Sequence, residues 1–255
     1  MARRPGSATI VCMRQIAVIT ACAALLTAAS TGCGMDLDAE EIHAAQSFPF
    51  TGTTLKINAS LGGVRVLQGT GGAVQVERWL RGKAVTDGPA WSLRDGTLRL
   101  SASCSMVFGD CGARYHVKVP PGVRLSVDAA DGVVLQGLAQ DVDVESRDRI
   151  QVTGASGRLR LSSEGPITGD GLKSGYVRCR TSDGSIDVAF ASVPTTVDLQ
   201  SRDGKVTARV PSGSYAVTAK STEGDSRSEI KDDGDKGTGT IVARSTSGDV
   251  QVLEK

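Results

Sequence analysis

The chain has 255 residues, 29 basic and 28 acidic side chains and a formal net charge of +1. This balance gives no electrostatic bias toward nucleic acid, so nucleic-acid binding is not expected. Glycine is frequent, at 31 residues, and aromatic residues make up only 4% of the chain. Such a composition favours tight turns and thin layers of β-structure over a helical core.

Residues 1–32 are predicted to be an export signal. Arg3, Arg4 and Arg14 precede an uncharged apolar stretch, residues 16–29, that is too short for a membrane span. Met13 is an alternative start for this signal.

The signal ends in Ser30-Thr31-Gly32-Cys33, which resembles a bacterial lipobox. Ser30 is a departure, because the pattern prefers an aliphatic residue there. The resemblance implies cleavage before Cys33, acylation of that cysteine and attachment to the outer face of the cell membrane. Ordinary cleavage and secretion are the alternative. Residues 33–47 are polar and acidic, so we expect a tether after the anchor, with His43 as an isolated surface residue.

Residues 48–120 are predicted to form a less regular β region. Leu55-Lys56-Ile57 and Val64-Arg65-Val66 flank Gly62-Gly63 like a diverged copy of the repeat that follows. Trp91 to Leu100 alternates around Asp95-Gly96, which is typical of a hairpin.

Three cysteines remain after the predicted signal and lipidation site. Cys104 and Cys111 are seven residues apart, and in an exported protein the simplest interpretation is a disulfide. A metal pair is the alternative, although no second histidine or carboxylate cluster completes a ligand set. Cys179 shares the parity of inward-facing Val177, so we predict a buried thiol.

Residues 121–255 contain a repeat with a period near 20 residues. Its clearest copy runs from Thr181 to Val188, and its apolar positions alternate as in half-buried strands. In most copies an acidic residue precedes a glycine, which predicts a corner with positive φ. In one degenerate copy Asp148 replaces the glycine. The predicted corner residues are Asp131, Gly132, Asp148, Glu164, Gly165, Asp183, Gly184, Asp203, Gly204, Glu223, Gly224 and Gly248.

Two architectures fit this repeat. If each strand pairs with the same strand of the next copy, the domain is a parallel β-solenoid, similar to a β-helix, with the diverged β region at its N-terminal end. If the corner joins paired strands, it is an antiparallel sandwich of hairpins. The nearly constant corner favours an all-β solenoid.

The corner carboxylates are expected to stack along such a solenoid. Asp183 and Asp203 occupy adjacent corners, with Glu164 and Glu223 flanking them. We interpret them as turn formers that Arg202 partly neutralises. A divalent ion between corners is the alternative, but no metal site and no cofactor are predicted.

The order of several motifs resembles a known family. Val119-Pro120-Pro121-Gly122-Val123, Thr181 to Ile186, Val210 to Tyr215 and Ser245 to Val250 are similar to the DUF4097 β-strand-repeat family, also labelled putative adhesin. The resemblance covers about residues 50–255 and implies the fold and a surface role. It supplies no catalytic residues.

No motif predicts catalysis. Gly-x-Ser-x-Gly, His-Glu-x-x-His and Cys-x-x-Cys are absent from the sequence, and Ser228-Glu229-Ile230-Lys231 lacks the companion motifs of penicillin-interacting enzymes. We therefore expect a non-enzymatic envelope lipoprotein that binds an unidentified surface protein or cell-wall partner. An accessory role in envelope-stress sensing is the alternative. A hydrolase would need carboxylates on an outer strand face, whereas here they concentrate at the corners.

Overall fold

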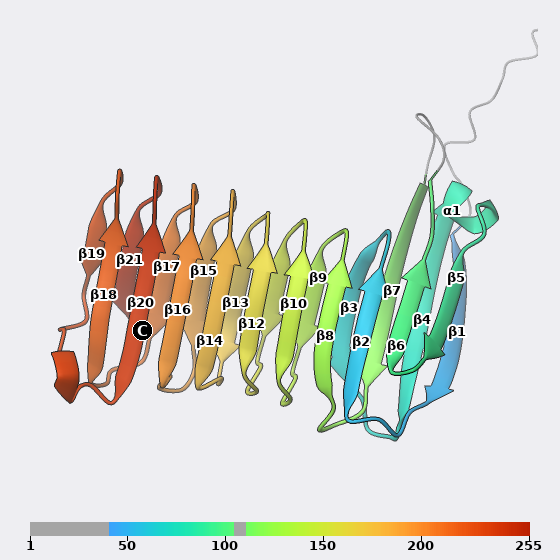
Figure 1. Cartoon of the computed structure of the whole chain (residues 1–255), viewed down its shortest axis with the longest axis horizontal. Helices are drawn as coiled ribbons and strands as arrows, with labels where there is room; N and C mark the ends of the chain where they lie inside the picture. The colour runs from blue at the N-terminus through green and yellow to red at the C-terminus, as the bar shows by residue number, and fades with distance from the viewer. Residues whose placement is uncertain (1–40, 105–110) are drawn as a thin grey trace, which may run out of the picture. The chain divides into compact units, whose positions relative to one another are not determined.

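The computed structural model describes residues 41–104 and 111–255. Almost all regular structure in these residues is β, in an 11-stranded sheet and a 10-stranded sheet, here sheet A and sheet B (Figure 1). Inward side chains of both sheets form one continuous hydrophobic core from Phe50 to Val252.

The strands of each sheet follow in spatial order. Sheet A consists of β1 (Ile42–Pro49), β4 (Ala73–Gly82), β7 (Cys111–Val119), β3 (Gly63–Gln68), β9 (Val133–Gln136), β11 (Ile150–Thr153), β13 (Ile167–Leu172), β15 (Ile186–Phe190), β17 (Val206–Val210), β21 (Val250–Glu254) and β19 (Ser226–Ser228). Sheet B consists of β18 (Tyr215–Ser221), β20 (Gly239–Ser245), β16 (Thr196–Ser201), β14 (Tyr176–Thr181), β12 (Leu159–Ser163), β10 (Val142–Ser146), β8 (Arg124–Ala129), β2 (Thr54–Ala59), β6 (Thr97–Ser101) and β5 (Ala90–Arg94). The short helices are α1 (Lys83–Thr86) and the 3₁₀ helix η1 (Gly234–Lys236).

The repeat forms a parallel solenoid, as predicted. Each copy contributes one strand to sheet B, a corner, and one strand to sheet A; we call this unit a coil. In sheet B, Val177 of β14 pairs with Leu159 of β12 on one side and Val197 of β16 on the other. Successive coils therefore place equivalent residues side by side, and the antiparallel sandwich is wrong for the repeat.

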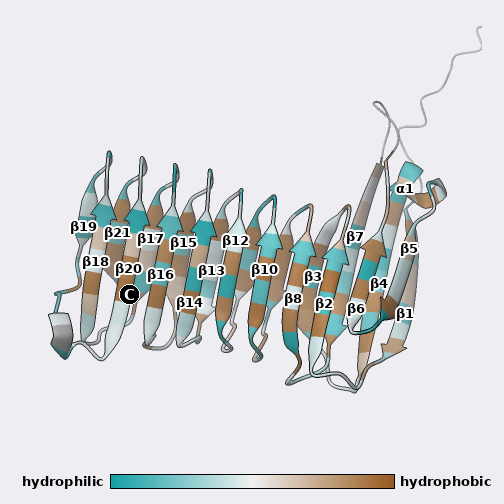
Figure 2. Cartoon of the chain, viewed as in Figure 1, coloured by the Kyte–Doolittle hydropathy of each residue, from teal (hydrophilic) through white to brown (hydrophobic). Residues whose placement is uncertain are grey.

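Alternation along the strands separates the core from the two outer faces. In β14, Val177 and Cys179 are fully buried, while Arg178 and Arg180, which alternate with them, are exposed. Figure 2 shows the same alternation of hydrophobic and hydrophilic bands along most strands. Burying these small apolar side chains is the main stabilising contribution available to a chain with so few aromatic residues.

A row of hydroxyl groups fixes the corners to one another. Ser201 Oγ donates to the Gly184 carbonyl of the preceding coil (2.9 Å) and accepts the Gly204 N–H of its own coil (2.8 Å). The same pair of hydrogen bonds, one donated to a corner carbonyl of the neighbouring coil and one accepted from a corner N–H of the same coil, recurs at five other hydroxyls. These are Ser146, Ser163, Thr181, Ser245 and Ser221. Each hydroxyl thus satisfies backbone groups that would otherwise be unpaired near the core.

The positive φ predicted at the repeat glycines is wrong. Gly132, Gly165, Gly184, Gly204, Gly224 and Gly248 are absent from the residues with positive φ, which in this part of the chain are Gly122, Gly137, Gly154, Gly171 and Gly234. Glycine is needed for a different reason, because a Cβ atom at Gly204 would collide with the Gly184 carbonyl, and one at Gly184 with Gly165. Asp148 also has no positive φ, so replacing it with glycine would relieve no backbone strain.

The last coils do not stack in the order of the sequence. β20 and β21, at the C-terminus, lie between the β16/β17 coil and the β18/β19 coil. Accordingly, Glu223 donates its N–H to the Thr246 carbonyl (2.9 Å) and does not stack on the Asp203 corner. The prediction that Glu223 flanks Asp203 is therefore wrong.

Hydrophobicity of the inward residues explains this order. Ile241, Val250 and Val252 of the inner coil are fully buried. Beside Val250 and Val252 the outer coil presents Ser226 and Ser228, which are exposed, and beside Ile241 it presents the partly buried Val217. The more apolar coil is covered on both sides, and the more polar one closes the end of the core.

The N-terminal end adds antiparallel strands to the solenoid. The β2/β3 coil pairs with β8 and β9, as expected of a diverged first copy. β5 and β6 form the predicted hairpin, with positive φ at Asp95 (49°) and Gly96 (71°). The division expected at residue 120 therefore separates irregular from regular coils that share two sheets and one core.

Strand β1 corrects the predicted tether of residues 33–47, because the chain enters sheet A at Ile42. Cross-strand stacking on Trp79 holds this polar strand. The His43 ring lies 4.7 Å from the Trp79 ring, and the Arg114 guanidinium lies 4.7 Å from the same ring. The sequence of β1 does not alternate between apolar and polar residues, because the contacts that hold this strand lie on its outer face.

Candidate functional site

An open groove of about 1190 Å³ lies where sheet B meets the corners. Its floor is the last outward side chain of successive sheet B strands, and the corner residues form its rim. We call it the corner groove, with the floor residues Asn58, Asp128, Glu145, Ser162, Arg180 and Gln200.

Parallel pairing gives the floor its regularity. Asp128 pairs in register with Glu145, Glu145 with Ser162, and Arg180 with Gln200. Equivalent side chains on adjacent strands lie about 4.8 Å apart, so the floor presents one polar group per coil. Such a surface suits an extended polar molecule better than a compact one.

Acidic side chains gather on β10. Asp143 and Glu145 point outward from the strand, and Asp141 precedes it. The expectation that carboxylates concentrate at corners is therefore incomplete, since these residues lie on an outer strand face. Among the described residues no group of three or more metal-ligating side chains could hold an ion.

Basic side chains follow on the neighbouring strands. Arg160 Nη1 lies 3.5 Å from the Asp143 carboxylate. Arg178 and Arg180 share the Asp198 carboxylate, at 3.0 and 3.4 Å. Strand parity places all these side chains outward, and counting charges along the outward positions could have found them in the sequence.

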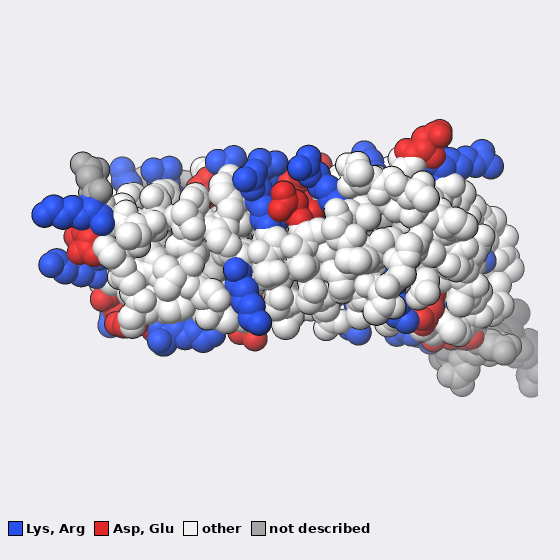
Figure 3. Space-filling view, turned by 90° about the horizontal axis from the view of Figure 1, so that it is seen from below, with Lys and Arg blue, Asp and Glu red and all other residues white. Residues whose placement is uncertain are grey.

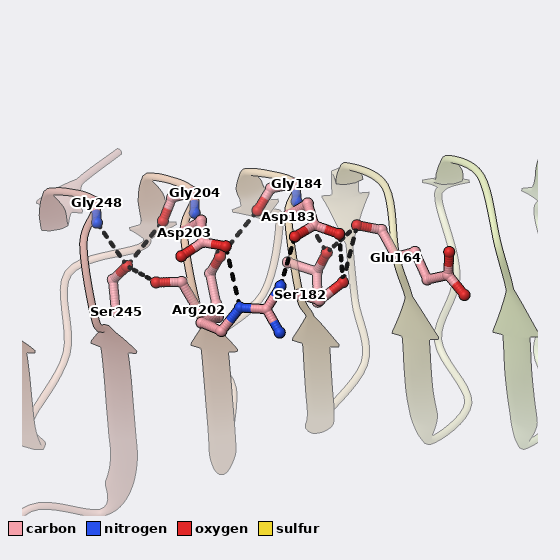
Figure 4. A network of polar contacts seen from close by, with 11 residues as sticks. Glu164, Ser182, Asp183, Gly184, Arg202, Asp203, Gly204, Ser245 and Gly248 are labelled. Carbon is pink, nitrogen blue, oxygen red and sulfur yellow. Dashed lines mark hydrogen bonds and ion pairs between the residues drawn. The ribbon is translucent and has the colours of Figure 1, made fainter.

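The sequence-predicted corner carboxylates form a separate network on the rim (Figure 4). Arg202 Nη2 lies 2.6 Å from Asp183, and its Nε lies 3.0 Å from Asp203. The Ser182 hydroxyl bond and the charge of Arg202 lower the pKa of Asp183. A guanidinium thus lies between the two carboxylates where the alternative interpretation placed a divalent ion.

The other predicted corner residues do not converge on one centre. Asp131 accepts the Gly62 N–H, Asp148 contacts Arg149 at 3.9 Å, and the Glu164 carbonyl accepts the Asp183 N–H at 3.0 Å. Gly132, Gly165, Gly184, Gly204, Gly224 and Gly248 lie one per coil along the corner edge. These residues build the rim, and none of them forms a catalytic arrangement with the others.

The cysteines have structural environments. Cys104 and Cys111 are joined by a disulfide with Cα atoms 5.9 Å apart. Cys179 is fully buried, and burial raises the pKa of its thiol to about 12, so it is not a nucleophile at neutral pH. Cys33 lies outside the described residues.

A family model describes residues 123–254 as Toastrack DUF4097. This match covers more than half of the chain and includes the regular coils. The chain belongs to the DUF4097 family. The resemblance seen in its turn motifs is thereby confirmed.

No curated protein matches this DUF4097 chain in sequence. Solved structures similar to it include a putative cell adhesion protein from Clostridium sporogenes, with 10% identity, TM-score 0.39, and coverage of 85% of this chain and 100% of the other. A putative lipid binding protein from Parabacteroides distasonis has 10% identity, TM-score 0.46, and coverage of 83% and 96%. A putative adhesin from the same species has 11% identity, TM-score 0.37, and coverage of 85% and 98%.

Among the described residues of the DUF4097 chain, no helix is long and apolar enough to cross a membrane.

Proposed function

We propose that this DUF4097 chain is a non-enzymatic protein of the cell envelope that binds an extended polar partner in the corner groove. The observation that carries this proposal is the row of outward polar and charged side chains that runs across successive coils of sheet B. The corresponding outer face of sheet A is nearly neutral between β9 and β21, where Arg209 is paired with Asp187. The two faces therefore offer different surfaces to a partner.

The disulfide supports a location outside the cytoplasm. Cys104–Cys111 closes a short loop, and such bonds persist in oxidising compartments. Together with the predicted signal and lipobox, the disulfide favours a lipoprotein that is anchored through Cys33 to the outer face of the cell membrane. The segment between Cys33 and Ile42 then serves as the tether.

Several features argue against catalysis. Both histidines, His43 and His116, lie at the N-terminal end of sheet A and outside the groove. The buried Cys179 thiol has a raised pKa. The feature that a hydrolase would use is the register pair Asp128 and Glu145, so hydrolysis of envelope glycans by the purified protein, lost in Asp128→Asn, would contradict the non-enzymatic assignment.

Anchoring gives a direct prediction. Two or three acyl chains on Cys33 should hold the protein in the membrane fraction, since each buried CH₂ contributes about 0.8 kcal/mol. Cys33→Ala should release the protein into the medium or leave an uncleaved precursor, as measured by fractionation and mass spectrometry of the N-terminus. Wild-type protein found wholly in the medium, with its N-terminus near Thr31, would contradict the lipoprotein assignment.

Partner binding is tested with purified residues 41–255 and isolated cell envelope. We expect cosedimentation to decrease when Ser162→Glu with Gln200→Glu alters the groove floor. The matched control, Gln151→Glu with Thr168→Glu, makes the same change of charge on the outer face of sheet A and should bind like wild type. Failure of the wild-type domain to cosediment would overturn the proposed function.

A further inference from the structure

Unbalanced positive charge on the outer face of sheet B is concentrated in its C-terminal half. In the C-terminal half, the sheet B strands β12, β14, β16, β20 and β18 carry one outward carboxylate, Asp198. The same strands, with the residue that directly precedes β12, present six cations: Arg158, Arg160, Arg178, Arg180, Arg244 and Lys220. In the N-terminal half, β10, β8 and β2 carry two cations, Lys56 and Arg124, against four carboxylates, Asp128, Asp141, Asp143 and Glu145, and the end strands β6 and β5 add Arg99 and Arg94. The whole chain has a net charge of only +1, so this concentration comes from placement and not from composition.

We call the six cations of the C-terminal half the cationic strip. Figure 3, which views the molecule from below, shows charged side chains gathered along the two long margins and a largely uncharged edge between them. The strip follows the stacking direction: β12, β14, β20 and β18 contribute its cations, while β16, between β14 and β20, contributes Asp198 instead. An elongated partner with repeated negative charges is complementary to this arrangement.

Two pairs of cations lie directly side by side. Arg160 is the register partner of Arg178, and Lys220 is the register partner of Arg244. Like charges on adjacent strands repel one another and destabilise the sheet. Within the described residues no ion pair involves Arg244 or Lys220, so no carboxylate of this part of the chain is paired with either cation to offset their repulsion.

Other members of the strip are held in fixed positions with donors to spare. Asp198 accepts from both Arg178 and Arg180, and Arg180 also donates to Gln200. Each guanidinium has five N–H donors, so shared bonds to a single carboxylate leave several donors free for an anion. The Arg158 guanidinium lies 4.9 Å from the Tyr176 ring, which also restricts its orientation. A partner therefore meets an array that is already ordered.

We propose that the cationic strip binds a polyanionic polymer of the cell envelope that bears phosphate or carboxylate groups along its length. This inference rests on the proposed function and specifies the chemistry of its partner. The bound polymer offsets the repulsion within the two cation pairs. A soluble or wall-linked polymer fits better than a lipid surface, because the strip belongs to a strand face with few exposed apolar side chains to enter a bilayer.

Binding is measured with sodium polyphosphate and with polygalacturonate, each fluorescently labelled, at about 50 mM ionic strength, where screening is modest. We expect wild type to bind at least one of them, and Arg180→Gln with Arg244→Gln to weaken that binding about tenfold. The matched control, Lys56→Gln with Arg99→Gln, removes the same charge from the N-terminal half of the face and should change binding less than twofold. Wild type that binds neither polymer, or a control that loses as much affinity as the strip variant, would overturn the inference.

Stability supplies a second readout. Arg244→Gln alone should raise the melting temperature by about 1 °C at low salt, because it removes the positive charge beside Lys220, and the gain should vanish at high salt. Polyphosphate should raise the melting temperature of wild type more than that of Arg244→Gln. An equal rise in both proteins would contradict a site at the strip.

Two further arms separate the possible outcomes. Vesicles containing phosphatidylglycerol that bind more tightly than either polymer would identify a lipid surface and overturn the polymer assignment. If Arg180→Gln with Arg244→Gln still binds isolated envelope as wild type does, the strip inference fails while the proposed function stands. If wild type binds polyphosphate but not envelope, the proposed function fails.

Discussion

Gly204→Ala is expected to destabilise the protein by about 3 kcal/mol or more, because overpacking a fixed backbone costs at least as much as overpacking a core side chain. The added Cβ would collide with the carbonyl carbon and oxygen of Gly184 and with the Ser185 nitrogen. These are backbone atoms of the preceding coil, and the hydrogen bonds of the Ser201 hydroxyl to the Gly184 carbonyl and the Gly204 N–H hold the two corners together. Thermal and urea unfolding would measure the loss.

Gly132→Ala is the matched control in the same corner motif. There the nearest atom to an added Cβ is the flexible Arg149 Cγ at 3.3 Å, so the expected change is within about 0.5 kcal/mol. Equal melting temperatures for Gly204→Ala and Gly132→Ala would show that the corners are not in close contact. The comparison separates close approach from backbone conformation, because neither glycine has positive φ.

Deletion of residues 239–255 is expected to remove the cooperative fold of the C-terminal half. Ile241, Val250 and Val252 are fully buried, and burying each such side chain contributes about 1.5–3 kcal/mol. Their joint loss is comparable to the whole stability of a typical domain. The β18/β19 coil cannot replace them without loss, because it brings Ser226 and Ser228 to the core positions. Circular dichroism melts and binding of a hydrophobic dye would report the effect.

Deletion of residues 214–237 is the matched control, since it removes the end coil and leaves the inner one. Pro211 to Gly213 then connects β17 to β20 with a loop like those between earlier coils. We expect a cooperative melt, accompanied by self-association through the newly exposed Ile241 and Val252. If instead the 239–255 deletion melts like the full domain, the C-terminal coil is not an inner coil.

Much of the fold could be predicted from the sequence because each coil repeats the same short-range pattern. Alternation around Thr181 to Val188 predicted the strands, and the nearly constant corner predicted their stacking. In most copies the inward residues on either side of the corner, such as Cys179 and Ile186, are seven positions apart, and in two copies they are six apart. The hydroxyl at Thr181 explains that gap, since it accepts the N–H of Gly184 three residues later. Where the gap is six, Ser163 accepts from Gly165 two residues later.

The order of the last coils could not be read from local pattern. Ser221 to Asp225 and Ser245 to Asp249 are nearly equivalent as corner motifs, so sequence order was the natural assumption. The difference lies in the inward residues beyond the corner, Ser226 and Ser228 against Val250 and Val252. The coil with the more apolar inward residues takes the inner position, and the period of the repeat does not predict which coil this is.

The corner motifs alone do not predict the candidate site. The acidic outward face of β10 and the cationic strip follow from the parity of the strands, yet they become one surface only when register is known. Asp143 and Arg160 are 17 positions apart and meet as register partners. The sequence shows which outward residues are charged, but the strand pairing decides which of them lie side by side.

Arginine footprinting of the envelope-bound domain tests the central claim most directly. The purified domain is treated with phenylglyoxal, free and bound to isolated envelope, and the modification of each arginine is measured by mass spectrometry. Envelope should protect Arg178, Arg180 and Arg244 on sheet B, while Arg65 and Arg209 on sheet A stay as reactive as in the free protein. Equal reactivity of the sheet B arginines in both states, or protection confined to sheet A, would contradict the account.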